Sequence, residues 1–145
     1  PVPAGRDDFI FGKPGLGVGQ GENYERRPTV DDHPVYAMAG VKHEDIDALY
    51  TYDAFTPLVW FALERFGFVG PGEAPAFCDE GNIALGGRLP VNTNGGLLSE
   101  AHLEGWNLQM EIVRQLRGEA GPRQVKGAEV IQRANAYGDY QIYRR

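Results

Sequence analysis

The chain has 145 residues, a formal net charge of −6 and 42% hydrophobic residues, which fits one globular domain with a sizeable core. The negative charge and the lack of a Lys/Arg run exclude a nucleic-acid surface. One cysteine, Cys78, excludes an internal disulfide and a multi-cysteine zinc site, and we expect no metal. No apolar run reaches the roughly 18 residues of a membrane span and no signal-peptide pattern is present, so we expect a cytoplasmic protein.

Residues 1–30 are rich in glycine and proline, and we separate this leading segment from a domain at residues 31–145. Its stretch "GLGVGQG" has the wrong glycine spacing for a dinucleotide fingerprint, and no helical pattern follows. We expect a loop or a strand there.

A capped helix and then a strand are predicted after the leading segment. Asp31 or Asp32 is the expected cap, Pro34 lies in the first turn and Gly40 ends the helix. Residues 41–52 predict a short turn that leads into a buried strand, because apolar residues and β-formers follow one another.

A second helix is predicted to open at Thr56, as its cap, and Pro57, in its first turn. Its apolar residues lie nearly all round, so we expect it to be buried until it ends at Gly67. Residues 67–93 show no clear period and predict a long loop, of a length that is usually functional.

A third helix with one apolar face is predicted to end at Gly118. The face repeats at three- and four-residue steps, at Leu103, Trp106, Met110 and Val113. A strand, a turn at residues 137–139 and a second strand are expected to follow. This order predicts an α/β fold, and its few strands indicate an incomplete domain or a partner that completes the sheet.

Tyr52 and Asp53 follow the first predicted strand and precede the second helix. Ligands bind at such strand ends in α/β sheets, so both residues are candidates for a site. Spacing alone also fits an Asp53 that is an ordinary cap or turn residue.

The stretch "NTNGGLLSEAH" carries a second group of candidates. Asn94 can donate a hydrogen bond, Gly95 and Gly96 let backbone N–H groups approach a ligand closely, and His102 can serve as acid, base or hydrogen-bond donor. A tight turn followed by a helix that happens to carry a histidine accounts for the same spacing.

Tyr137 is the third candidate, at the predicted turn between the last two strands. A functional tyrosine there would give or take a substrate proton, whereas a tyrosine at a hairpin is more often a packing residue.

Taken in series, these motifs resemble the C-terminal half of a thiolase-superfamily subunit, over roughly residues 30–145. The segments that carry the likeness are "AGVKHEDIDALYTYDAFTPLVWFALERFGFVGPGEAPAF" and "GRLPVNTNGGLLSEAHLEGWNLQMEIVRQLRGEAGPRQV". They are most similar to the branch of the sterol-carrier-protein thiolases and lipid-transfer-protein enzymes. The resemblance implies a layered α-β-α fold, of which this chain holds the C-terminal half.

The sequence departs from the thiolase pattern at three places. Tyr52 replaces the Asn of an Asn-Glu-Ala-Phe stretch, and His102 is flanked by alanine and leucine where thiolases have Gly-His-Pro. The segment around Tyr137 replaces the Cys-x-Gly that carries the base cysteine, and Cys78 lies far upstream of it. Without that thiolate, Claisen chemistry loses its base.

The same branch includes a steroid side-chain-cleaving aldolase, and the resemblance to it implies a retro-aldol cleavage of a β-hydroxyacyl-CoA. In this hypothesis Tyr52 and Tyr137 transfer protons, with Tyr140 as the alternative to Tyr137, and Asp53 orients a tyrosine or a water. His102, Asn94, Gly95 and Gly96 hold the thioester oxygen.

The resemblance also implies acyl-CoA as the substrate with no separate cofactor, a homodimer, and a partner with an OB-fold domain of the DUF35 kind, giving a heterotetramer. Two other hypotheses stay open. One is a true acyl-CoA thiolase of the sterol-carrier type, and the other is a non-catalytic half that serves as a scaffold.

Overall fold

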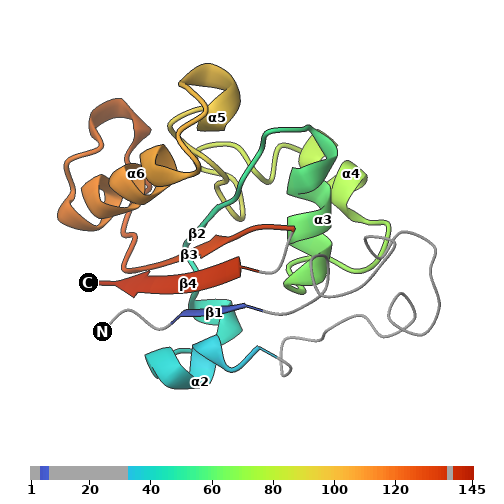
Figure 1. Cartoon of the computed structure of the whole chain (residues 1–145), viewed down its shortest axis with the longest axis horizontal. Coiled ribbons are helices and arrows are strands. Elements are labelled where there is room, and N and C mark those ends of the chain that lie inside the picture. Colours follow the sequence, from blue (N-terminus) through green and yellow to red (C-terminus); the bar gives the residue numbers. More distant parts are fainter. Residues whose placement is uncertain (1–3, 7–32, 137–138) are drawn as a thin grey trace.

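The computed structural model describes residues 4–6, 33–136 and 139–145, and within these ranges the fold is a four-stranded sheet with helices on both faces (Figure 1). The strands are β1 (Ala4–Arg6), β2 (Ala48–Tyr50), β3 (Val130–Ala134) and β4 (Asp139–Arg144), in the order β1-β4-β3-β2. β2 pairs parallel with β3, and the other two pairs are antiparallel. The predicted α/β class is confirmed, and the leading segment contributes β1 to the same sheet.

The helices are α2 (Val35–Ala39), α3 (Pro57–Arg65), α4 (Ala74–Asp79), α5 (Gly96–Ser99) and α6 (Trp106–Arg117), with 3-10 turns at His43–Asp45 and Gly121–Arg123. The predicted ends at Gly40 and Gly118 and the predicted start at Pro57 are confirmed. Asp31 and Asp32 lie outside the described residues, and Thr56 makes no side-chain cap hydrogen bond. The predicted loop over residues 67–93 is wrong in part, because α4 lies within it. A helix of six residues is too short to show a helical period in the sequence.

Two apolar clusters form the core, one on each face of the sheet. Because side chains alternate along a strand, Leu49 packs into the cluster with α2, α3 and α4, while Ala48 and Tyr50 pack into the cluster with α5 and α6. In Figure 1, α5 and α6 lie above the sheet and α2 below it. The two faces together give the expected α-β-α layering.

The apolar face predicted for the third helix lies at the surface and not in the core. Trp106 is 65% exposed and Met110 57% exposed, whereas Leu108 and Ile112 are buried together with the polar Glu111. The second helix, α3, is likewise not buried all round, since Phe61 is exposed. α6 therefore carries an exposed apolar ridge, formed by Trp106, Met110 and Val113, and Leu98 and Leu103 before the helix are exposed as well.

His43 makes folding sensitive to acid. Its Nε2–H donates to the carbonyl oxygen of Phe66 at 2.8 Å, its ring lies 4.5 Å from that of Phe68, and burial lowers its pKa below the ordinary 6.5. A lowered folded-state pKa means that the unfolded chain takes up the proton first, so this stability is present above pH 6.5 and is lost as pH falls through the folded-state pKa.

We therefore expect the melting temperature of the intact protein to fall between pH 7 and pH 5, and the fall to be smaller in His43→Gln, which keeps a donor for the carbonyl. Thermal melts at both pH values test this. An equal fall in the variant would assign the acid sensitivity to other groups.

Candidate functional site

Tyr52 and His102 meet at the end of β2. The Tyr52 hydroxyl lies 3.1 Å from His102 Nε2, and the two rings are perpendicular at 89° with centroids 5.9 Å apart. Tyr52 follows the strand by two residues, and His102 lies in the segment between α5 and α6. Two candidates 50 positions apart in the sequence thus form one hydrogen-bonded pair.

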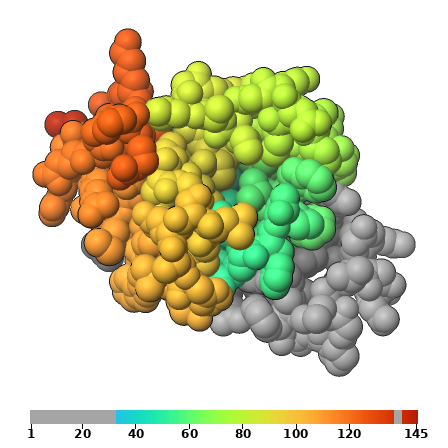
Figure 2. All heavy atoms as spheres, turned by 90° about the horizontal axis from the view of Figure 1, so that it is seen from above, coloured from blue at the N-terminus to red at the C-terminus, as the bar shows by residue number. Residues whose placement is uncertain are grey.

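The pair lies at the surface. Tyr52 is half-buried against the cluster on the α6 side, and His102 is exposed. From above, the segment around residues 90–105, yellow to light orange, lies between α3 in green and α6 in orange (Figure 2). A substrate group can therefore approach the imidazole from solvent.

Glu104 is a member of this group that sequence reasoning missed. One of its carboxylate oxygens, Oε1, lies 3.1 Å from His102 Nε2, the same nitrogen that contacts Tyr52. Its backbone is left-handed, with φ of 52°, which is uncommon outside glycine. No sequence pattern distinguishes it from any other exposed glutamate.

Asp53 anchors the glycine loop. Its buried carboxylate accepts the Leu97 N–H at 2.8 Å, in the first turn of α5, and occupies the space where a Cβ on Gly96 would lie. Only a glycine at position 96 leaves room for this carboxylate, and the left-handed φ of 68° at Gly96 also favours glycine. This hydrogen bond fixes the start of α5 next to Asp53, and therefore close to Tyr52 in the chain.

The loop satisfies its own donors. Gly95 N–H donates to the carbonyl of Asn92 at 2.7 Å, and Gly96 N–H donates to Asn94 Oδ1 at 3.3 Å. Asn94 Nδ2 donates to Glu100 Oε2 at 2.8 Å. The carboxamide and backbone groups expected to hold a ligand oxygen thus bond within the loop in this structure.

Asn92 was also missed, and it fixes the loop to the sheet. Its side-chain amide forms two 2.9 Å hydrogen bonds with the backbone N–H and carbonyl of Thr51, just beyond β2. Its left-handed φ of 45° is one that asparagine tolerates better than most residues, which is the one signal available in the sequence.

The structure does not place either tyrosine candidate near the C-terminus in this site. Tyr137 lies outside the described residues. Tyr140 is buried in β4, with its ring edge-on to His33 and Phe66 in the cluster on the α2 and α3 side. Tyr52 packs against the opposite cluster, so the structure does not bring Tyr140 to the Tyr52 and His102 pair.

A family model for the thiolase C-terminal domain-like proteins matches residues 32–139. This chain belongs to that family. Over 84 residues it is 50% identical to a steroid side-chain-cleaving aldolase of Thermomonospora curvata, covering 58% of this chain and 22% of the relative. Over 100 residues it is 44% identical to the 17-hydroxy-3-oxo-4-pregnene-20-carboxyl-CoA lyase of Mycobacterium tuberculosis, covering 63% of this chain and 26% of that enzyme.

The thiolase-like domain is also similar to a solved structure of the Ltp2-ChsH2(DUF35) aldolase. The TM-score is 0.68 at 40% identity, over 74% of this chain and 28% of the other. The chain thus spans about a quarter of the length of these relatives. The expected thiolase-like α/β fold from the C-terminal part of such a subunit is confirmed.

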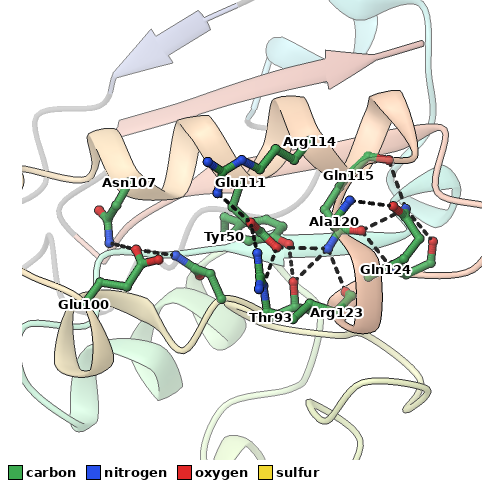
Figure 3. A network of polar contacts seen from close by, with 12 residues as sticks. Tyr50, Thr93, Glu100, Asn107, Glu111, Arg114, Gln115, Ala120, Arg123 and Gln124 are labelled. Carbon is green, nitrogen blue, oxygen red and sulfur yellow. Dashed lines mark hydrogen bonds and ion pairs between the residues drawn. The ribbon is translucent and has the colours of Figure 1, made fainter.

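Behind the site of this thiolase-like domain, a polar network joins α6 to the loop (Figure 3). Arg123 donates through Nε and Nη2 to the Glu111 carboxylate, at 3.1 Å each, and the side chain of Glu111 is only 1% exposed. Gln115 Nε2 donates to Thr93 Oγ1 at 3.0 Å, and Thr93 shares a 2.6 Å hydrogen bond with the Tyr50 hydroxyl.

This network explains the polar residues on the buried face of α6. Burial raises the pKa of Tyr50 to about 12, so its phenol stays protonated at neutral pH and serves as a structural hydrogen-bonding group. Glu100 Oε2 accepts from Asn107 Nδ2 at 2.8 Å as well as from Asn94. The helix therefore holds the loop from behind through side chains.

Across the described ranges, no group of three or more His, Cys, Asp and Glu side chains is placed to hold a metal ion. None of the helices in that part of the chain has the length and apolar character needed to cross a membrane.

Proposed function

We propose that this domain belongs to a retro-aldol carbon–carbon lyase that cleaves a β-hydroxyacyl-CoA. The carrying observation is the hydrogen-bonded pair of Tyr52 and His102 at the strand end, where a proton-transferring phenol and an imidazole face solvent together. The names of the two relatives, an aldolase and a CoA lyase, support the reaction class. Cys78 lies in α4, and burial raises the pKa of its thiol, which disfavours a thiolate.

The reaction balances without an external oxidant or reductant. A base takes the proton of the β-hydroxyl, the C–O bond becomes a carbonyl, and the electron pair of the Cα–Cβ bond moves to the thioester as an enolate. An acid then protonates Cα and releases a shorter acyl-CoA beside a ketone. Each positioned proton transfer is worth about 10²–10⁴-fold in rate.

In this proposal Tyr52 protonates Cα and His102 stabilises the phenolate that remains. Tyr137 is the second proton-transferring group, and the burial of Tyr140 on the opposite face favours Tyr137 over it. His102, Asn94, Gly95 and Gly96 together form the pocket proposed for the thioester oxygen. Asp53 holds this loop.

We propose a steroid side-chain CoA thioester as the substrate of a cytoplasmic enzyme, with propionyl-CoA as the shorter product and no separate organic cofactor. The name of the solved relative supports a DUF35-type partner. We propose a heterotetramer of two thiolase-like and two DUF35-type chains. The exposed ridge of α6, with Trp106 and Met110, is an apolar surface of the kind that another domain or a partner subunit covers.

The full-length protein, purified with its DUF35-type partner, tests the function directly. Incubation with a β-hydroxyacyl-CoA of a steroid side chain is expected to give equal amounts of ketone and propionyl-CoA. Incubation of the matching β-ketoacyl-CoA with free CoA is the control and is expected to give no shortened product. Thiolysis without aldol cleavage would identify the protein as a thiolase instead. If neither reaction occurred, the result would favour a non-catalytic scaffold.

A further inference from the structure

We propose that Glu104 is a positioning residue that keeps the proton on His102 Nε2 and thereby turns the Tyr52 O–H toward the substrate. The proposal rests on the proposed aldol cleavage. It assigns a role to a residue that neither the motifs nor the family resemblance singled out.

The geometry poses a choice, because one nitrogen faces two partners. His102 Nε2 is 3.1 Å from the Tyr52 hydroxyl and 3.1 Å from Glu104 Oε1. A neutral imidazole carries one proton, on either Nδ1 or Nε2, and the partners of each nitrogen decide which form is favoured.

With the proton on Nδ1, Nε2 is a bare acceptor. It can take the Tyr52 O–H, but its lone pair then faces the lone pairs of the Glu104 carboxylate at contact distance, which is repulsive. With the proton on Nε2, the N–H donates to the carboxylate and to the Tyr52 oxygen. A carboxylate can only accept, so Glu104 favours this second form.

The consequence falls on Tyr52. Once its oxygen accepts from Nε2–H, its own O–H is not committed to His102 and can donate toward a bound substrate. When the phenol gives this proton to Cα, the O–H bond breaks and its electron pair stays on oxygen. The Nε2–H then stabilises the phenolate through a charge-assisted hydrogen bond.

The backbone of the α5–α6 segment aims the Glu104 carboxylate at the ring. Glu104 has φ of 52°, and Gly105 after it has φ of 80°. The Nη2 of Arg133, on β3, lies 2.7 Å from the position that a Cβ on Gly105 would take, so the segment runs directly against the sheet. A strained non-glycine residue whose exposed carboxylate meets a histidine points to a role at that histidine. An exposed ion pair adds little to stability, so folding does not require this contact.

Glu104→Gln in the full-length protein with its partner tests the proposal, because the glutamine amide can donate as well as accept and no longer selects one form of the ring. We expect kcat for aldol cleavage to fall about tenfold or more, within the range of a proton-transfer contribution, with KM changed less than twofold. Glu119→Gln removes another exposed glutamate, beyond the end of α6, and is expected to keep the wild-type kcat.

A second readout needs no substrate. The ¹⁵N resonances of the His102 ring, assigned by their loss in His102→Gln, report which nitrogen carries the proton. We expect Nε2–H in the wild type and a mixture of both forms in Glu104→Gln. An unchanged ring in the variant overturns the role of Glu104 even where kcat falls. A wild type that cleaves no substrate overturns the proposed function instead, and the ring still tests Glu104.

Discussion

Replacing Tyr52 by phenylalanine is expected to lower kcat for aldol cleavage by about 10²–10⁴-fold, the usual worth of a positioned acid or base. The change removes the hydroxyl that lies 3.1 Å from His102 Nε2 and leaves the ring, which packs against the cluster on the α6 side. Loss of a half-exposed hydroxyl costs folding little, so the melting temperature is expected to stay near the wild-type value. Steady-state rates and thermal melts of the same preparation separate the two effects.

Tyr143→Phe is the matched control. Its hydroxyl donates to Gln141 at 2.8 Å and to Gln109 at 3.3 Å, so the substitution removes the same atom from a half-buried tyrosine away from His102. We expect nearly unchanged kcat in this variant. Equal kcat in Tyr52→Phe and wild type would leave the catalytic role of Tyr52 without support and would favour the scaffold hypothesis.

Local signals predicted the elements that position the site. The apolar run before Tyr52 predicted β2, Pro57 predicted the start of α3, and the glycines at 40 and 118 predicted two helix ends. Such signals act within a few residues, so they are readable without the fold. The pairing of β1 with β4 joins the two ends of the chain, and no local signal carries it.

The candidate site could be predicted only in part, for the same reason. The motif order pointed to Tyr52 and His102, and the structure brings them together. Glu104 escaped notice because its position depends on the left-handed turn before α6 and on Arg133 beneath Gly105. Those contacts come from β3, which lies nearly thirty residues further along the chain.

The exposed ridge of α6 shows what periodicity leaves open. A three- and four-residue repeat at Trp106, Met110 and Val113 says that a helix face is apolar, but not what covers it. The other face is buried although Glu111 and Gln115 lie on it, because Arg123, Thr93 and the loop carbonyls supply their partners. Buried polar groups of this kind follow from tertiary contacts that a pattern of hydrophobicity does not contain.

Gly96→Ala is expected to be the most destabilising single substitution in the loop. An alanine must adopt the left-handed φ of 68°, which costs about 1–2 kcal/mol, and its Cβ displaces the Asp53 carboxylate. The buried Leu97 N–H then loses its acceptor at about 1–3 kcal/mol, so we expect a total loss of about 2–5 kcal/mol in the free energy of unfolding. Urea titration of the full-length protein measures it.

Gly118→Ala is the control that separates the cost of the left-handed backbone from the cost of displacing the Asp53 carboxylate. Gly118 has a similar φ of 73°, and no atom lies within 4 Å of an added Cβ, so this variant carries the backbone cost alone. The difference between the two variants is therefore the contribution of the Asp53 contact to folding. Because Asp53 directly follows Tyr52 and α5 leads to His102, only Gly96→Ala is expected also to lower kcat. Equal losses of stability in both variants would mean that the loop re-forms around the methyl group, and that Asp53 does not fix the distance between Tyr52 and His102.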